Sequence, residues 1–283
     1  MSLNLEVPTA LEHFACLVEH DAGFPLLEVA TSLAQVAEPH VDIQDVLYQV
    51  DLLASRLRKK IPWGASAIQR TYVLNEFFYE TLGFAANTND FTNPGNSFLH
   101  QVLHSRRGIP ISLAVLWMEL AWGAGLKVDG ISFPGHFYVK IYVDEGIIIQ
   151  DPLTGRGMTQ SMLAERLEPF RESWGLSEED MPPLHLFLTP ATGRETTERM
   201  LRNLKTIYSA DTESSSQLLA VLDRLIILCP QDWSSFRDRG LALAQCGLRQ
   251  AALQDLQTYV RNTASPQDLP LIEAHIELLR TEP

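Results

Sequence analysis

The sequence is poor in cysteine and in positive charge, and it has no long apolar run. Its three cysteines, Cys16, Cys229 and Cys246, form no C-x-x-C pair, which argues against a zinc knuckle, a redox motif or a disulfide scaffold. The 22 Lys and Arg against 35 Asp and Glu give a net charge of −13, which disfavours non-specific binding to nucleic acid or anionic membranes. No segment approaches the ~20 apolar residues of a membrane span, and the N-terminus lacks a signal-peptide pattern. We therefore expect a cytoplasmic protein with no direct nucleic-acid partner and no membrane partner.

The remaining composition is that of an ordinary folded protein. Hydrophobic residues make up 46% and charged residues 20% of the 283 residues, a length that suggests about two domains. Helix-period apolar residues predict helices over residues 9–60, 66–82 and 113–124, with Asn96 or Ser97 capping a shorter helix that runs to Ser105. Period-two alternation over 136–143, followed by 147–149, predicts an antiparallel hairpin.

The C-terminal third repeats itself. Two helical segments close on the same phrase, Pro-Gln-Asp, about 36 residues apart. Gly240, Gly247, Ala252 and Leu256 fall where a tetratricopeptide repeat places small or packing residues, and residues 268–280 look like a solvating cap helix. We predict two domains: residues 1–190, containing the N-terminal helices and an antiparallel sheet, and residues 195–283, a helical repeat region.

Three residues of the first domain have the order of a nucleophilic triad. Ser112 lies at the start of a helix, His136 opens a strand and Asp151 follows its partner strand. Their positions, 136 and 151, differ by an odd number, so a hairpin loop of even length places both side chains on one face of the sheet. Direct pairing across the strands needs a turn centred on Val143 and Asp144. Because the best turn sequence lies slightly later, we expect a bulge to absorb the offset.

At these residues the chain resembles the bacterial SirB family, in which a transglutaminase-like core precedes tetratricopeptide repeats. The resemblance rests on NSFLHQVLHSRRGIPISLAVLWMELAWGAGL, FPGHFYVKI and IIIQDPLTG, and it extends over most of the chain. It implies an α+β, papain-like fold with a triad of Cys, His and Asp. His136 matches the His and Asp151 the Asp, while the Cys position falls at or within about two residues of Ser112. The family name implies a link to the control of gene expression.

The sequence departs from an active thiol enzyme because no cysteine is available at this helix start. A serine hydroxyl needs concerted base assistance and an oxyanion hole to do the work of a thiolate. One interpretation is a degenerate core that acts as a protein-interaction or regulatory factor through its repeats. The other is an acyl-transfer enzyme or amide hydrolase with Ser112 as nucleophile, His136 as base and Asp151 orienting the base.

The remaining candidates are binding residues. Arg107, with its neighbour Arg106, is a candidate for holding a carboxylate or phosphate at the mouth of the cleft. The alternative is an internal salt bridge or a helix-end cation. Asn96 either belongs to the same site or only caps a helix. His100 and His104 have the i, i+4 spacing of zinc ligands, but Gln101 replaces the acidic residue that follows the first His in metalloproteases. We expect no metal site and no cofactor, and we expect a protein partner at the repeats.

Overall fold

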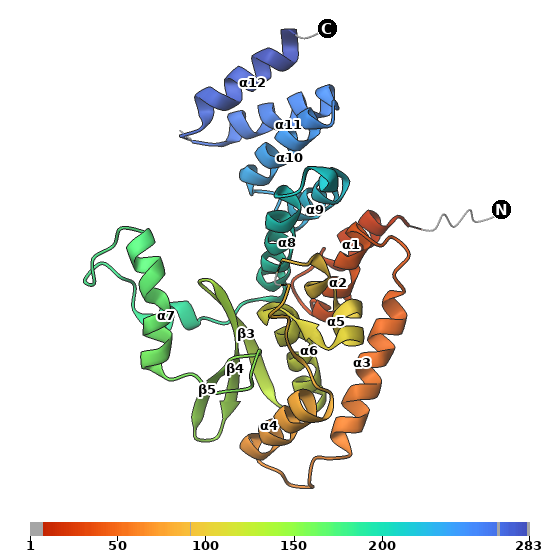
Figure 1. Cartoon of the computed structure of the whole chain (residues 1–283), viewed down its shortest axis with the longest axis vertical. Helices are drawn as coiled ribbons and strands as arrows, with labels where there is room; N and C mark the ends of the chain where they lie inside the picture. Colours follow the sequence, from red (N-terminus) through yellow and green to blue (C-terminus); the bar gives the residue numbers. More distant parts are fainter. Residues whose placement is uncertain (1–7, 91, 265–266, 282–283) are drawn as a thin grey trace, which may run out of the picture. The chain divides into compact units, whose positions relative to one another are not determined.

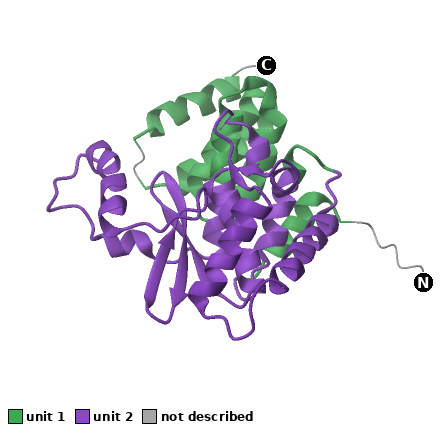
Figure 2. Ribbon diagram, turned by 60° about the horizontal axis from the view of Figure 1, so that its bottom comes forward, with its two compact units in different colours: residues 1–20, 35–39, 201–283 green, residues 21–34, 40–200 purple. Residues whose placement is uncertain are grey.

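The protein divides into two compact units, which are described separately. The computed structural model describes residues 8–90, 92–264 and 267–281. The core unit comprises residues 21–34 and 40–200, and the repeat unit comprises residues 8–20, 35–39 and those from 201 onward (Figure 2). The first N-terminal helix thus belongs to the same unit as the C-terminal repeats. The sequence-based boundary between residues 190 and 195 stays a prediction.

Helices make up one layer of the core unit, with α6 (Pro110–Gly123) packed at its centre (Figure 1). Pro110 occupies the first helical position, where a missing N–H costs nothing, so α6 begins two residues before Ser112. Trp117 on this helix is fully buried and Trp122 is partly exposed. The other helices of the layer are α2 (Leu26–Ser32), α3 (Ile43–Arg58), α4 (Ala67–Asn75) with a π-helical continuation (Glu76–Thr81), and α5 (Leu99–Ser105).

Two helix ends differ in how well the sequence predicts them. Ser66 caps α4 through a capping box with Gln69, at the predicted start. The expectation that Asn96 or Ser97 caps α5 is wrong: the capping position is Phe98, which makes no side-chain cap. The Asn96 side chain instead donates to the carbonyl of Asp90 at 2.6 Å, so its hydrogen-bonding capacity serves the preceding loop.

The sheet is an antiparallel meander of β3 (Lys127–Phe133), β4 (His136–Val143) and β5 (Gly146–Gln150). The predicted hairpin of β4 and β5 is confirmed, whereas β3 was not predicted. A two-residue loop joins β4 to β5, and the register runs from Val143↔Gly146 to Val139↔Gln150 without a break. A separate short parallel pair joins β1 (Ala85–Ala86) to β2 (Arg107–Gly108).

Each face of the sheet is covered by a different helix (Figure 1). On one face, Gly130 leaves room for the Phe137 ring and for Met118 of α6. On the other, Phe133 and Tyr138 share a buried cluster with Leu163 and Leu167 of α7 (Gln160–Ser173). Strands that are buried on both faces have few positions open to solvent. Accordingly, every residue of β4 from His136 to Val139 is buried.

The repeat unit is entirely helical within the part of the chain that is described. Gly240 lies where an added Cβ would come 2.8 Å from Leu256, so the glycine permits close packing of the two helices that carry these residues. Ala252 and Leu256 are fully buried, as the repeat pattern predicts. Its helices are α1 (Ala10–Leu17), the end of α8 (Gly193–Ser209), α9 (Ser215–Leu228), α10 (Trp233–Gln245), α11 (Arg249–Asn262) and α12 (Leu269–Thr281).

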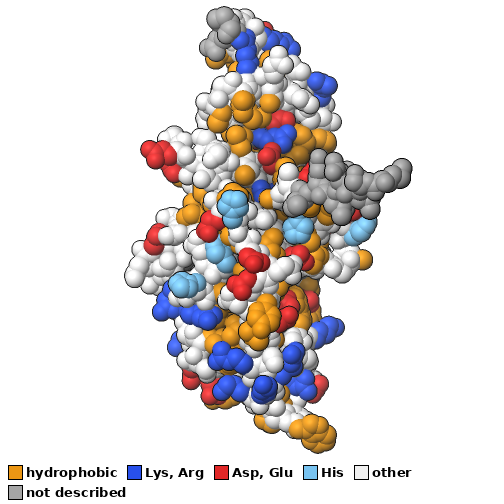
Figure 3. Space-filling model, turned by 90° about the vertical axis from the view of Figure 1, so that its right-hand side faces the viewer, with side chains coloured by type: hydrophobic (Ala, Val, Ile, Leu, Met, Phe, Trp, Pro, Cys, Tyr) orange, Lys and Arg blue, Asp and Glu red, His pale blue; other side chains and the backbone are white. Residues whose placement is uncertain are grey.

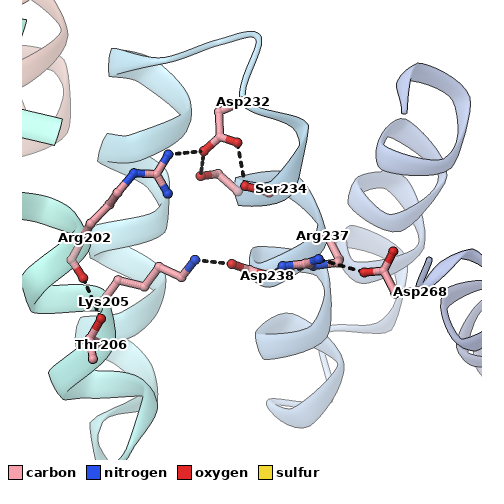
Figure 4. A network of polar contacts seen from close by, with 9 residues as sticks. Arg202, Lys205, Thr206, Asp232, Ser234, Arg237, Asp238 and Asp268 are labelled. Atoms are coloured by element: carbon pink, nitrogen blue, oxygen red, sulfur yellow. Dashed lines mark hydrogen bonds and ion pairs between the residues drawn. The ribbon is translucent and has the colours of Figure 1, made fainter. Parts of the chain in front are cut away.

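Ion pairs connect alternate helices of this unit, α8 with α10 and α10 with the start of α12 (Figure 4). Arg202 on α8 bonds Asp232 at 3.1 Å, and Lys205 on the same helix bonds Asp238 on α10. Arg237 on α10 bonds Asp268, ahead of α12, at 2.7 Å. These cations are neutralised by carboxylates of the unit itself.

Among the described residues, no helix combines the length and the apolar character that a membrane span requires. The core unit mixes helices with a small antiparallel sheet, which is the α+β class predicted from the sequence.

Candidate functional site

Ser112, the candidate nucleophile, is the third residue of α6 and is fully buried. Its hydroxyl donates to the carbonyl of Asn96 at 2.6 Å and accepts the N–H of Ile109 at 3.1 Å. It also lies 3.1 Å from the Ile109 carbonyl. Gly108 makes this contact possible, because an added Cβ there would lie 2.7 Å from the Ser112 oxygen. The hydroxyl therefore ties the start of α6 to the preceding segments.

His136 and Asp151 form a buried pair. His136 Nε2 lies 3.1 Å from Asp151 Oδ1, and each side chain is 9% exposed. The two side chains share one face of the sheet, as the odd separation and two-residue loop predict. The expected bulge is absent from the β4–β5 pairing; Asp151 lies one residue beyond the last pair, Val139↔Gln150, and reaches His136 diagonally.

The Asp151 carboxylate is held ionised by its neighbours. Burial alone would raise its pKa, but the hydrogen bonds from His136 and from the N–H of Leu153, with the charges of His136 and Arg166, lower the pKa below its usual value. Because an ionised carboxylate only accepts hydrogen bonds, Nε2 of His136 carries the proton.

The loop after β5 is anchored from α4 and its π-helical continuation. Tyr79 donates its hydroxyl to the carbonyl of Pro152 at 3.0 Å, and its ring occupies the space beside Gly155. Asn75 donates to Gln150 at 2.7 Å and accepts from the Trp117 indole at 2.9 Å. Burial, with the nearby charge of Asp151, raises the pKa of Tyr79. No periodicity or motif in the sequence indicates this anchoring role.

The structure brings His136 and Asp151 together but not Ser112. His136 lies on the sheet face of Tyr138, whose ring centroid is 4.6 Å away, and this face packs against α7. Helix α6, which carries Ser112, packs on the opposite face beside Gly130 and Phe137. Within the described residues, the Ser112 hydroxyl bonds backbone groups of Asn96 and Ile109 and not the imidazole.

The candidate binding residues bond the chain's own backbone. Arg107 is exposed, and its guanidinium donates to the carbonyls of Gly83 at 2.8 Å and Arg106 at 3.0 Å. Asn96 is buried, donates to Asp90 and accepts from Asn87. Neighbouring Arg106 has a left-handed backbone with φ of 60° and stacks 4.8 Å from the Phe84 ring. Burial, with the charge of Arg56, lowers the pKa of Arg106.

The candidate zinc spacing lies on α5, where His104 is exposed and His100 is half-buried. Across residues 8–90, 92–264 and 267–281, no group of three or more His, Cys, Asp or Glu side chains is placed to hold a metal ion.

A second candidate site lies in the repeat unit, between α11 and α12. A groove of about 490 Å³ has Val260 and Ile276 as apolar lining, with Gln257, Arg261, Glu273, Glu277 and Arg280 completing it. Outside the groove, α12 also exposes Leu271 and Leu278, at 60% and 54% of their surface. The helix predicted as a solvating cap therefore presents apolar side chains as well.

Comparison with known proteins identifies both parts of the chain. Residues 44–202 match the transglutaminase-like superfamily, and residues 204–277 match the tetratricopeptide repeat. The fold predicted from the sequence, a transglutaminase-like core followed by helical repeats, is thereby confirmed.

The chain is also similar along its length to bacterial relatives. The UPF0162 protein of Xylella fastidiosa (strain Temecula1) is 35% identical over 267 residues, which cover 93% of this chain and 92% of the relative. UPF0162 protein YchA of Escherichia coli K12 is 25% identical, over 89% of this chain and 91% of its own. Among solved structures, menin aligns with 96% of this chain and 76% of its own, at 11% identity and a TM-score of 0.40. This chain belongs to the UPF0162 family of transglutaminase-like proteins with tetratricopeptide repeats.

Proposed function

We propose that this protein is a protein-interaction and regulatory factor that acts through its helical repeats. The groove between α11 and α12 is the observation that carries this proposal. Its apolar lining, with Arg261 and Arg280 beside Glu273 and Glu277, suits an extended or helical protein segment with charges of both signs. The resemblance to the SirB family supports a regulatory role, and the three widely spaced cysteines fit a cytoplasmic location. The net charge of −13 favours a protein over nucleic acid as its partner.

The proposal includes a non-catalytic core, with Ser112, His136 and Asp151 as a vestigial triad. Two observations support it: no cysteine lies at the start of α6, and the Ser112 hydroxyl is engaged by backbone groups. In this view Asn96 and Arg107 hold the loops around α6. They are not ligand contacts.

A catalytic alternative rests on the buried pair of His136 and Asp151 at 3.1 Å, which has the geometry of an oriented base. It requires Ser112 to leave its backbone partners and reach the imidazole. A fluorophosphonate probe separates the two functions: we expect no labelling at Ser112, and labelling that is lost in His136→Ala would establish the enzyme.

The interaction role is tested by comparing proteins that co-purify with full-length variants. Arg261→Glu with Arg280→Glu reverses two cations of the groove, while Lys127→Glu with Arg156→Glu reverses two exposed cations of the core unit as the matched control. We expect a specific partner to be lost from the groove variant and kept by the control. Partners that bind both variants equally would refute the groove as the binding site.

A further inference from the structure

The charge of this chain is unevenly distributed. Between Asp51 and Glu76 the sequence has no acidic residue and five basic ones, although the whole chain carries −13. Four of the five cations fall within residues 56–60, at the end of α3. In Figure 3, Lys and Arg side chains gather around the lower end of the molecule, and hydrophobic side chains project beyond them. The summed charge of −13 disfavours a membrane partner, but it conceals this basic segment.

The cations at this end are available to a ligand. Arg58, Lys59 and Lys60 are exposed, and in the described part of the chain none of them pairs with a carboxylate. Arg56 stacks 5.6 Å from the Phe77 ring. The helix dipole accounts for cations in the last turn of α3, but not for the apolar residues that follow them.

Immediately after the cations, a tight turn presents a tryptophan to solvent. The N–H of Ala65 donates to the carbonyl of Pro62 at 3.2 Å, and Gly64 takes a left-handed conformation with φ of 75°. Trp63 sits at the corner of this turn with 103% of its surface exposed, so it makes no packing contact with its own chain. On the following helix, α4, Ile68 and Tyr72 are also exposed, one turn apart.

We propose that residues 56–64, the cationic tip, bind the surface of an anionic phospholipid bilayer. Tryptophan is favoured at the boundary of headgroups and acyl chains, and lysine and arginine beside it reach lipid phosphates. A protein partner needs a preformed pocket for a side chain that stands alone, whereas a fluid bilayer conforms to it. The acidic remainder of the chain is repelled only weakly, since charges beyond about 8 Å are screened at physiological salt.

Vesicle sedimentation with the full-length protein tests the proposal. We expect binding to phosphatidylglycerol vesicles, little binding to phosphatidylcholine vesicles, and weakening as salt rises. Each exposed cation contributes about fivefold to the partition coefficient, so Lys59→Glu with Lys60→Glu should lower it by more than tenfold. Trp63→Ala should lower it by about tenfold, since the indole no longer enters the boundary.

Matched variants and a second ligand make the result decisive. Lys127→Glu with Arg156→Glu, and Ile147→Ala at another exposed apolar site, should leave vesicle binding unchanged. The six substituted positions of the tip and control variants, 59, 60, 63, 127, 147 and 156, are all exposed. Circular dichroism checks that each variant folds. Equal binding to both lipids, or wild-type binding by the tip variants, would overturn the proposal. Binding of a fluorescent polyglutamate peptide without any binding to vesicles would assign the tip to an acidic polypeptide instead.

Discussion

Among single side chains, Ser112 is the one whose placement decides the chemistry available to the core unit. Its hydroxyl satisfies the N–H of Ile109 and donates to the carbonyl of Asn96, and it is fully buried. An active nucleophile must instead contact its base and be open to substrate.

We predict that restoring the cysteine does not restore a reactive thiol. In Ser112→Cys, the sulfur remains buried among the backbone groups of Asn96 and Ile109 and makes no contact with the imidazole of His136, so no imidazolium lowers its pKa. Alkylation by iodoacetamide, followed by mass spectrometry, should label the exposed Cys16 and Cys246 at least tenfold faster than position 112. Faster labelling at position 112, abolished by His136→Ala, would contradict the prediction.

Asp151 should contribute stability that depends on pH. Removing its carboxylate in Asp151→Ala leaves His136 and the N–H of Leu153 without their acceptor, at a cost of about 1–3 kcal/mol near neutral pH. Because the folded pKa is below the unfolded value of about 3.9, this contribution is present above that pH and is lost as pH falls through the folded pKa. Urea unfolding should therefore show the difference from wild type shrinking below about pH 4. The exposed Asp144→Ala serves as the control, with no effect expected at either pH.

At the scale of elements, Arg239 joins three helices of the repeat unit. From α10 it donates to both carboxylate oxygens of Asp255 on α11, at 2.6 and 2.9 Å, and to Asp223 on α9 at 2.8 Å. Asp255 is only 5% exposed, and Arg239 is the cation that pairs with its buried carboxylate. The hydrogen bond to Asp255 raises the pKa of Arg239. Burial opposes this rise, and the hydrogen bond to Asp223 adds to it.

Arg239→Ala should accordingly destabilise the repeat unit by about 2–4 kcal/mol, because it leaves the Asp255 carboxylate buried and unpaired. Arg239→Lys should recover only part of this, since an ammonium cannot make the two-pronged contact. Thermal unfolding followed by circular dichroism measures both. An Arg239→Lys variant with the melting temperature of the wild type would show that the geometry of the guanidinium does not contribute to stability.

The elements also differ in how far the sequence predicts them. In helix α6 the apolar residues recur at helix spacing without interruption, and in β4 of the hairpin with β5 they alternate with polar ones. Both elements were predicted for this reason. Strand β3 was not, because Gly130 and the surface residues Lys127 and Ser132 interrupt its apolar pattern while contacts with β4 hold it in place. The pair of His136 and Asp151 could be predicted because an odd sequence separation and a hairpin loop of even length place both side chains on one face of the sheet. The separation of Ser112 from this pair depends on which sheet face α6 covers, which local sequence does not encode.

At the scale of the whole molecule, the division into units does not follow the order of the chain. Helix α1 packs against α9, and Arg224 lies 5.7 Å from the ring of the fully buried Phe14. A boundary drawn in sequence places α1 with the core, because periodicity identifies a helix without identifying its partner.

Phe14→Ala should therefore loosen the repeat unit. Truncating a fully buried phenylalanine costs about 3–5 kcal/mol. Hydrogen exchange should reveal the loss as faster exchange in α9, with β3 to β5 unchanged. Phe137→Ala, in the core unit, should give the reverse pattern. Faster exchange in the sheet of Phe14→Ala would show that α1 stabilises the core unit.

The partnership of α1 with α9 also has a consequence for biosynthesis. During translation α1 leaves the ribosome before α9, which lies about two hundred residues later in the chain. Phe14 thus lacks its packing partners on α9 while the intervening segments, which include the whole core unit, emerge and fold. The repeat unit therefore closes only after α9 has emerged, when the segments of the core unit are already outside the ribosome.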